Sequence, residues 1–294
     1  MELLQMKYFL AVAREESISK AADFLYITQP SLTRQIQSME KEVGQPLFTR
    51  GGRKMLLTEA GILLRKRAQE IIALYEKAES EWLSPHEDVS GEVYIGGGET
   101  YGMTILMDVV CEMRKTYPNI KINIYSGDIT DVCEHLDKGL IDFGLLLQPA
   151  DLTKYENIRL PFADTWGLLM HKDHPLAQKE YIVPEDLNGV PLIQSRHSLP
   201  KSYLTEWYKS VENIEIVGTY NLLNNAAFMA MKKIGCVLCL DKLVNTTGES
   251  NLAFRPLKPT VEFALDVVWK KYQVFSKAAQ IFLKYLQEHI AQNI

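Results

Sequence analysis

The sequence lacks any run of about 18 or more apolar residues, and its N-terminus lacks the pattern of a signal peptide. Cysteine is scarce, with 4 among 294 residues, which excludes a disulfide-stapled scaffold. These absences predict a soluble, cytoplasmic protein. The content of hydrophobic residues, 47%, is enough to fill real cores, and the length suggests two domains.

An overall excess of positive charge is also missing, since the formal net charge is −5. The charges are nevertheless unevenly distributed. Residues 1–87 contain 12 Lys or Arg and 12 Asp or Glu, whereas residues 88–294 contain 20 and 25. Within residues 28–67 the counts are 8 and 3, so positive charge is concentrated there. That concentration is typical of a nucleic-acid contact surface.

Catalytic and metal-binding constellations cannot be argued from the sequence. No Ser-His-Asp set or paired carboxylates stand out, so we expect no enzyme, no catalytic residue and no cofactor. Cys236 and Cys239 form a lone C-x-x-C pair, and on a strand they would point to opposite faces, which favours buried structural thiols over zinc binding or redox sensing. His171 and His174 have no third ligand nearby, so no metal is expected.

What the sequence does contain is a helix-turn-helix pattern between Ser17 and Thr58. Ser17 or Ser19 can cap the first of its two helices, Thr28 can cap the second, and Gly44 stops the second. The second helix has an apolar stripe that repeats every three or four residues, formed by Leu32, Ile36, Met39 and Val43. A helix of this kind is shaped to enter the major groove of DNA.

The opposite face of that helix carries short or planar hydrogen-bonding side chains. They are Gln29, Ser31, Thr33, Arg34 and Gln37. Gln can pair with adenine through two hydrogen bonds, and Arg can pair with guanine in the same way. The alternative is an ordinary solvated helix face, but such a face would usually carry Glu and Lys. The composition therefore favours DNA recognition.

A basic hairpin, or wing, is predicted after the second helix. Leu47 and Phe48 are apolar and can attach it to the core. The two glycines at its tip, in Arg50-Gly51-Gly52-Arg53-Lys54, permit the positive φ angles of a tight turn. Arg50, Arg53 and Lys54 suit phosphates or a minor groove, although a solvated basic turn without a partner is the alternative.

A long amphipathic helix is predicted over residues 59–83, with Thr58 as its cap. Its apolar residues follow the heptad spacing of a coiled coil, at Gly61, Leu64, Ala68, Ile71, Tyr75, Ala78 and Trp82. The alternative is a helix packed on its own domain. Because a DNA-binding dimer needs two modules at a fixed separation, we expect dimerisation through Leu64, Ala68, Ile71, Tyr75, Ala78 and Trp82. The polar segment 84–90 predicts a hinge.

Strands and helices alternate from Gly91 onwards, which predicts an α/β domain. The first five elements, over residues 92–95, 101–116, 121–125, 129–138 and 141–147, have the order βαβαβ and imply a mostly parallel sheet. Further strands are predicted over residues 165–171, 190–194, 215–219, 235–240 and 265–271. Further helices are predicted over residues 201–209, 226–233 and 276–290.

The first part of the chain resembles the signature of LysR-type bacterial transcriptional regulators. The matching residues are Ala21-Ala22, Thr28-Gln29-Pro30-Ser31-Leu32, Met39-Glu40, Gly44, Leu47-Phe48, Arg50 and Leu57-Thr58. The resemblance covers essentially the whole chain but is weaker after residue 150. It implies an all-α winged helix-turn-helix domain (1–58), a linker helix (59–83), a hinge (84–90) and a two-lobed, periplasmic-binding-protein-like α/β effector-binding domain (91–294). Its first lobe is expected to comprise residues 91–162 and 267–294, and its second lobe residues 163–266.

The resemblance also implies site residues. The DNA-contacting positions of the family's recognition helix match Gln29, Pro30, Ser31, Thr33 and Arg34, and its wing contacts match Arg50 and Arg53. Thr100, Gln148 and Ser195 lie at or beside effector-contact positions, and Asn224 lies near another. Two departures stand out: Lys233 occupies a position where the family often has glycine, and the proline often found near Asp241 is missing.

Ligands of open α/β sheets bind beyond the carboxyl ends of the strands. This rule, with the resemblance, predicts effector contacts at Glu99, Thr100, Tyr101, Ser126, Asp128, Gln148, Gln194, Ser195, Arg196 and Asn224. The glycine-rich segment before Thr100 precedes a helix and could hold an anion, although a glycine turn that only caps the helix is the alternative. Arg196 and Lys201 favour a carboxylate, whereas Glu99 and Asp128 suit an amine, so an amino acid or a small organic acid fits both.

These observations predict a sequence-specific transcriptional regulator that responds to a small molecule bound between two lobes. Its expected partners are a partly palindromic promoter in double-stranded DNA, further copies of itself in a homodimer or homotetramer, and RNA polymerase, with no membrane. One alternative is an architectural DNA-binding protein without an effector. The other is a small-molecule binding protein or enzyme whose N-terminal domain serves assembly only.

Overall fold

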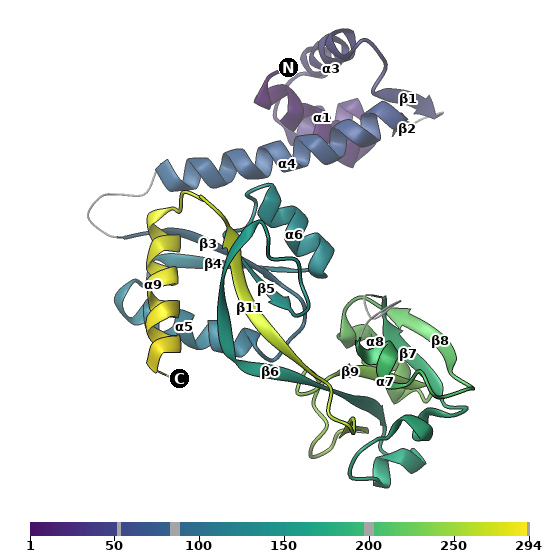
Figure 1. Ribbon diagram of the computed structural model, residues 1–294. Coiled ribbons are helices and arrows are strands. Elements are labelled where there is room, and N and C mark those ends of the chain that lie inside the picture. The colour runs from purple at the N-terminus through teal and green to yellow at the C-terminus, as the bar shows by residue number, and fades with distance from the viewer. Residues whose placement is uncertain (52–53, 83–88, 197–202, 293–294) are drawn as a thin grey trace. The chain divides into compact units, whose positions relative to one another are not determined.

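The computed structural model describes residues 1–51, 54–82, 89–196 and 203–292. The chain divides into two compact units, Met1–Leu83 and Ser84–Ile294 (Figure 1). The first unit consists of helices and one hairpin, and the second is an α/β unit.

Helices dominate the first unit. Its elements are α1 (Leu3–Glu15), α2 (Ile18–Phe24), α3 (Gln29–Val43), β1 (Phe48–Gly51), β2 (Lys54–Leu57) and α4 (Glu59–Trp82). Phe9, Ala21, Leu32 and Met39 are fully buried in one core to which all four helices contribute. β1 and β2 pair antiparallel, and the Phe9 and Phe48 rings lie 5.2 Å apart, so the hairpin is attached to this core. The predicted winged helix-turn-helix is confirmed.

The ends of these helices follow the local sequence. The Ser17 hydroxyl accepts the N–H of Lys20 at 3.4 Å, and Gly44 ends α3 with a φ of +80°, which glycine adopts without strain. The Thr58 hydroxyl accepts the N–H of Gly61 at 3.0 Å, as a cap of α4 should. Thr28 occupies the N-cap position of α3 but forms no side-chain cap hydrogen bond.

The second unit contains a mixed sheet with the order β4-β3-β5-β11-β6-β9-β7-β8, and β10 pairs with β6. Its strands are β3 (Gly91–Gly97), β4 (Ile120–Ser126), β5 (Phe143–Leu147), β6 (Tyr155–His171), β7 (Pro191–Ser195), β8 (Glu215–Tyr220), β9 (Cys236–Leu240), β10 (Leu252–Pro256) and β11 (Glu262–Lys270). The long strand β6 runs from one lobe into the other, and β11 returns beside it (Figure 1).

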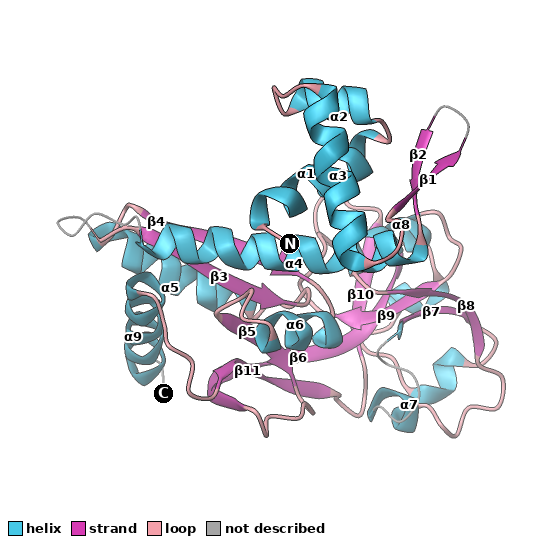
Figure 2. Ribbon diagram, turned by 90° about the horizontal axis from the view of Figure 1, so that it is seen from above, coloured by secondary structure: helices cyan, strands magenta, loops and turns pink. Residues whose placement is uncertain are grey.

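Each lobe has helices on both faces of its part of the sheet (Figure 2). The helices are α5 (Met103–Thr116), α6 (Ile129–Asp137), α7 (Tyr203–Trp207), α8 (Leu223–Met231) and α9 (Lys277–Gln292), with short 3₁₀ turns η1 (Pro175–Gln178) and η2 (Pro184–Leu187). In the first lobe α5 and α9 share one core, and α6 covers the opposite face. In the second lobe α7 and α8 contribute to two separate cores.

The prediction of a mostly parallel sheet is only partly right. β4, β3 and β5 are parallel, as are β8, β7 and β9, but β6 and β11 run antiparallel to their neighbours. The predicted strand 165–171 is the second half of β6, and β10 was not predicted. Pro161 suggested a break in the sequence, but it lies where the register with β11 shifts between Ala264 and Asp266. A proline is tolerated there because its missing N–H removes no regular ladder bond.

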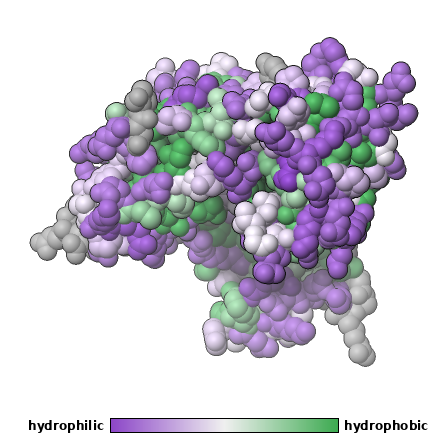
Figure 3. Space-filling model, turned by 90° about the horizontal axis from the view of Figure 1, so that it is seen from below, coloured by the Kyte–Doolittle hydropathy of each residue, from purple (hydrophilic) through white to green (hydrophobic). Residues whose placement is uncertain are grey.

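Within the described residues, no helix is long and apolar enough to cross a membrane. On the face seen from below, hydrophilic residues cover much of the surface, with hydrophobic residues exposed in patches between them (Figure 3).

Candidate nucleic-acid interface and effector cleft

Helix α3 exposes the side chains that the sequence assigned to DNA. Gln29, Pro30, Ser31 and Arg34 are exposed and Thr33 is half-buried. The apolar stripe of the same helix faces the core, where Leu32 and Met39 are completely inaccessible. The 3.6-residue period of the helix therefore separates a buried face from a polar face that carries its hydrogen-bonding groups outwards.

Two hydrogen bonds organise the start of α3. The Ser19 hydroxyl in α2 donates to the side-chain oxygen of Gln29 at 3.2 Å. The Thr33 hydroxyl donates to the main-chain carbonyl of Gln29 at 2.9 Å. Ser19 therefore favours one orientation of the Gln29 amide, which suits pairing with a base through two hydrogen bonds. Sequence reasoning considered Ser19 only as a helix cap.

The wing is fixed to α3 by Glu40. One carboxylate oxygen of Glu40 accepts the N–H groups of Leu47 and Phe48, at 2.8 and 3.2 Å. Lys54 is exposed and forms an ion pair with Glu16. The backbone of Arg50 lies in β1, opposite Met55 in β2. The side chain of Arg50 and the whole of Arg53 lie outside the described residues.

Helix α4 has two apolar faces. The predicted heptad positions include residues from both faces. Ala68 is fully buried in the core of the first unit and Leu64 packs against the same core, so the prediction that Ala68 faces another copy is wrong. A Cβ on Gly61 would lie 2.2 Å from the carbonyl oxygen of Leu47, so the glycine allows α4 to approach the wing.

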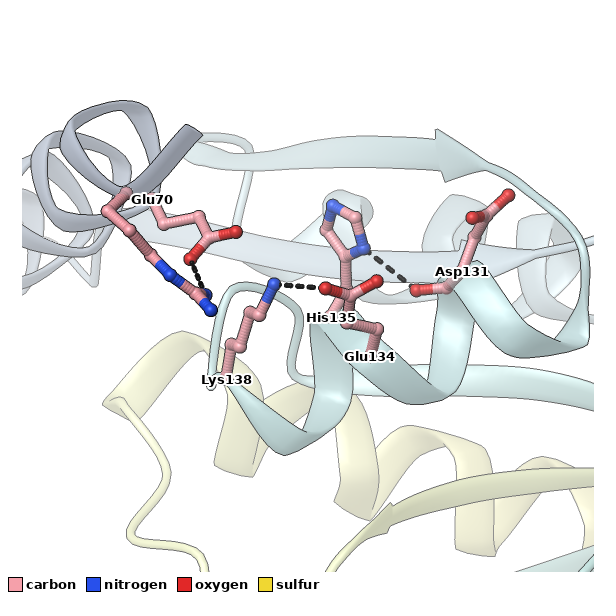
Figure 4. A network of polar contacts seen from close by, with 6 residues as sticks. Glu70, Asp131, Glu134, His135 and Lys138 are labelled. Carbon is pink, nitrogen blue, oxygen red and sulfur yellow. Dashed lines mark hydrogen bonds and ion pairs between the residues drawn. The ribbon is translucent and has the colours of Figure 1, made fainter. Parts of the chain in front are cut away.

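The outer stripe of α4 comprises Leu63, Ile71 and Leu74, whose side chains are 62%, 45% and 46% exposed. Tyr75 is exposed at the edge of this stripe and has the Lys7 ammonium 5.9 Å from its ring centroid. Ala78 is half-buried, and the side chain of Trp82 is outside the described residues. Arg67 and Glu70 on α4 form an ion pair at 2.9 Å (Figure 4).

In the second unit, the loop between β3 and α5 carries three of the predicted effector residues. The Glu99 carboxylate accepts the N–H of Leu223, the first residue of α8. The Thr100 hydroxyl donates to Asp164 on β6. The Tyr101 ring lies 5.8 Å from that of Phe162. Sequence reasoning missed Asp164, because it is separated from Thr100 by 64 positions.

Asp164 is only 1% exposed. Burial raises the pKa of its carboxyl group, because the charged form loses solvation. Hydrogen bonds from Thr100 and from the N–H of Tyr101, together with the charge of Lys242, oppose this shift. The β3–α5 loop is therefore anchored on a buried carboxyl group.

Asp128 caps α6. Its carboxylate accepts the N–H groups of Thr130 and Asp131 at 2.9 and 3.0 Å, and Ser126 is exposed at the end of β4. Further along α6, His135 Nδ1 lies 2.8 Å from the Asp131 carbonyl oxygen, and Glu134 and Lys138 form an ion pair (Figure 4). The carboxylate of Asp128 is thus already compensated by a helix N-terminus.

Gln148 belongs to a second polar cluster, on β5, β6 and β11. Its side-chain amide donates to Asp266 at 2.6 Å and its side-chain oxygen accepts the N–H of Ala150 at 2.9 Å. Asp266 is fully buried and also accepts from Asn157 and Arg159, at 2.9 and 2.8 Å. A cavity of about 510 Å³ lies beside this cluster, and Gln148, Arg159, Trp207, Glu262 and Phe263 are among its lining residues.

The other predicted effector residues lie in the second lobe. Gln194 is buried, and its side-chain oxygen accepts the Tyr208 hydroxyl at 3.0 Å. Ser195 is half-buried at the end of β7, and Arg196 and Asn224 are exposed. Lys201 lies outside the described residues. The structure thus brings Glu99 to the helix of Asn224, whereas Gln148 and Gln194 are engaged in separate contacts.

The four cysteines are free thiols. Cys236 and Cys239 contribute to different cores on opposite faces of β9, as the alternation of a strand predicted. Burial raises the pKa of Cys236 to about 11 and raises that of Cys239 further. Both thiols therefore stay protonated near neutral pH, which does not suit metal ligation or redox sensing.

His171 and His174 lie beside a small cavity of about 280 Å³ that Lys233 also lines. Asp173 pairs with His171 at 3.4 Å and with Lys233 at 3.0 Å. Among the described residues, no group of three or more His, Cys, Asp or Glu could hold a metal ion. Lys233 adopts a φ of +60°, the left-handed conformation that glycine favours.

Comparison with known proteins supports this architecture. Residues 3–62 match the bacterial regulatory helix-turn-helix protein model of the lysR family, and residues 86–291 match the LysR substrate binding domain. The Hca operon transcriptional activator HcaR of Escherichia coli (strain K12) is 30% identical over 99% of both chains. The uncharacterized HTH-type transcriptional regulator YybE of Bacillus subtilis (strain 168) is 26% identical over 99% of this chain and 100% of its own length.

Solved structures show the same fold. The crystal structure of CbnR, a LysR family transcriptional regulator, superposes with a TM-score of 0.79 at 19% identity and covers 99% of both chains. Full-length CbnR complexed with its target DNA gives 0.78 at 20% identity, with 98% of this chain and 100% of that chain covered.

The helix-turn-helix unit and the two-lobed unit together define a DNA-binding transcriptional regulator with an effector-binding domain. The chain belongs to the LysR family of bacterial regulators.

Proposed function

We propose that this regulator reads its promoter with the exposed N-terminal part of α3 and holds the DNA backbone with the wing. Gln29, Pro30, Ser31, Thr33 and Arg34 contact base edges or the adjacent backbone, and Arg50, Arg53 and Lys54 contact phosphates. The orientation of Gln29 by Ser19, at 3.2 Å, is the observation that carries this proposal. Two copies, joined through the outer stripe of α4, bind the halves of a partly palindromic site and present RNA polymerase with a fixed geometry.

The effector in this proposal is a small organic acid or an amino acid bound between the two lobes. In the sequence, the negative charges of Glu99 and Asp128 argued against an anionic ligand. Glu99 accepts one main-chain N–H group and Asp128 accepts two, in both cases at the start of a helix, which compensates their charges. Arg196 is exposed and can pair with a ligand carboxylate. Effector binding then shifts the closure of the lobes, provided that its affinity differs between the two states.

The DNA part of the proposal is tested by gel shift on the DNA upstream of the protein's own gene. We expect Arg34→Ala to abolish the preference for this DNA over a scrambled sequence. Lys54→Ala should weaken binding to both sequences alike and make it less dependent on salt. Equal, sequence-blind losses from the two variants would reject the assignment of α3 as the reading helix.

The effector part is tested by a thermal-shift screen of organic acids and amino acids against the whole protein. A ligand at 100 times its dissociation constant should stabilise the protein by about 2.7 kcal/mol. Arg196→Ala should reduce the shift given by a stabilising acid. A regulator without an effector would show no shift with any compound, which would favour the architectural alternative.

A further inference from the structure

The β3–α5 loop of the first lobe contacts the second lobe at two points. The Glu99 carboxylate accepts the N–H of Leu223, at the start of α8. Two residues later, the Tyr101 ring lies 4.9 Å from the ammonium of Lys242, which follows β9. Leu223 and Lys242 both belong to the second lobe, so one short loop connects the lobes through a hydrogen bond and a cation–π contact.

The N-terminus of α8 has no cap of its own. The N-cap position is Leu222, whose apolar side chain cannot accept a hydrogen bond, and no side-chain cap is formed there. The first N–H groups of a helix have no intrahelical acceptor, and a negative charge is favourable beside them. Glu99 therefore supplies from the opposite lobe what an N-cap residue normally supplies from within the chain segment.

Neighbouring residues fix the position of Glu99. Thr100, the next residue, is bonded to the buried Asp164. On the other side of the contact, burial raises the pKa of the Tyr220 phenol, and the negative charge of Glu99 raises it further. Tyr220 ends β8 shortly before α8, so the Glu99 carboxylate is close to two successive elements of the second lobe.

We propose that Glu99 is an interlobe latch, which holds the two lobes together by capping α8 from the opposite lobe. Lys242 and Tyr101 form the second contact of the same latch. An effector that changes the closure of the lobes has to alter these contacts. The latch itself needs no particular ligand and no DNA, so it can fail or succeed independently of the function proposed above.

The test is hydrogen–deuterium exchange of the full-length protein without ligand, in the wild type and in Glu99→Ala. We expect the N–H of Leu223 to exchange roughly fivefold to tenfold faster in the variant, because its acceptor is lost. Exchange should also rise in the segments around Tyr101 and Lys242, because the lobes separate. Glu99→Gln keeps an acceptor oxygen, so its exchange rates should lie between those of the wild type and those of Glu99→Ala.

The matched control is Glu92→Ala. Glu92 lies on β3 and accepts from Tyr94 and Asn123, at 2.6 and 2.8 Å, entirely within the first lobe. The Glu92→Ala variant should leave the exchange of the Leu223 N–H and of the segment around Lys242 unchanged. Two outcomes would overturn the latch: unchanged exchange in Glu99→Ala, or a rise confined to the first turn of α8, which would make Glu99 a local cap only.

Discussion

The hydroxyl of Ser19 in α2 donates a 3.2 Å hydrogen bond to the side-chain oxygen of Gln29, the first residue of α3. Ser19→Ala should leave the fold intact and free the Gln29 amide to rotate. A hydrogen bond of this kind contributes roughly 0.5–1.5 kcal/mol, so affinity for the promoter should fall about twofold to twelvefold. Binding to scrambled DNA should stay the same. Fluorescence anisotropy with both DNAs measures the ratio of the two affinities. Ser38→Ala, on α3, is the control.

Glu40 links α3 to the wing, and its removal should destabilise the first unit. Glu40→Ala leaves the N–H groups of Leu47 and Phe48 without their acceptor. Unsatisfied groups of this kind cost about 1–3 kcal/mol each when buried. Pulse proteolysis along a urea gradient, with cleavage within residues 1–83 as the readout, measures the loss. The exposed Glu79→Ala should change stability by less than about 0.5 kcal/mol, and an equal effect of both changes would contradict the role of Glu40.

The outer stripe of α4 should mediate self-association. Ile71→Glu combined with Leu74→Glu places charges on its exposed apolar side chains, and we expect the dimer dissociation constant to rise at least about tenfold because burying an unpaired charge is costly. Sedimentation velocity over a range of concentrations measures it. Ala68→Glu should instead unfold the first unit, because Ala68 lies in its core. An unchanged oligomer in the double variant would assign the interface elsewhere.

The buried cysteines should be slow to react. Because burial raises the pKa of Cys236 to about 11, its thiol carries little of the reactive thiolate at pH 7, and the thiolate fraction grows only as the pH approaches 11. Iodoacetamide should modify the exposed Cys111 first, and should reach Cys236 and Cys239 only after denaturation. Peptide mass spectrometry at pH 7 and pH 9 follows each site. Rapid modification of Cys236 in the native protein at pH 7 would contradict its burial.

Most of the first unit could be predicted from the sequence, because its signals are local. Ser17, Gly44 and Thr58 mark helix ends through contacts within a few residues. The stripe from Leu32 to Met39 separates buried from exposed positions by periodicity alone. The packing of helix α4 was harder to predict, because it carries apolar residues on two faces. Their period does not indicate which face packs against the rest of its own chain.

In the second unit, local sequence signals predict only part of the structure. The alternation of strands and helices could be predicted, but the first half of β6 was missed because Pro161 suggested a break. Pro161 fits in β6 only because the register with β11 shifts opposite this residue. The effector residues could be located only to the ends of strands. Their partners, such as Asp164 for Thr100 and Asp266 for Gln148, are distant in sequence.

The sequence by itself determined that this protein has a winged helix-turn-helix, that α3 exposes a face suited to DNA bases, and that an α/β unit follows. Spacing and composition decide these features within single elements. Only the tertiary structure decided that Ser19 orients Gln29, that Ala68 belongs to the core of its own unit, and that Glu99 caps α8 of the opposite lobe. Each of these depends on which elements pack together, and packing is set by the whole fold rather than by neighbours along the chain.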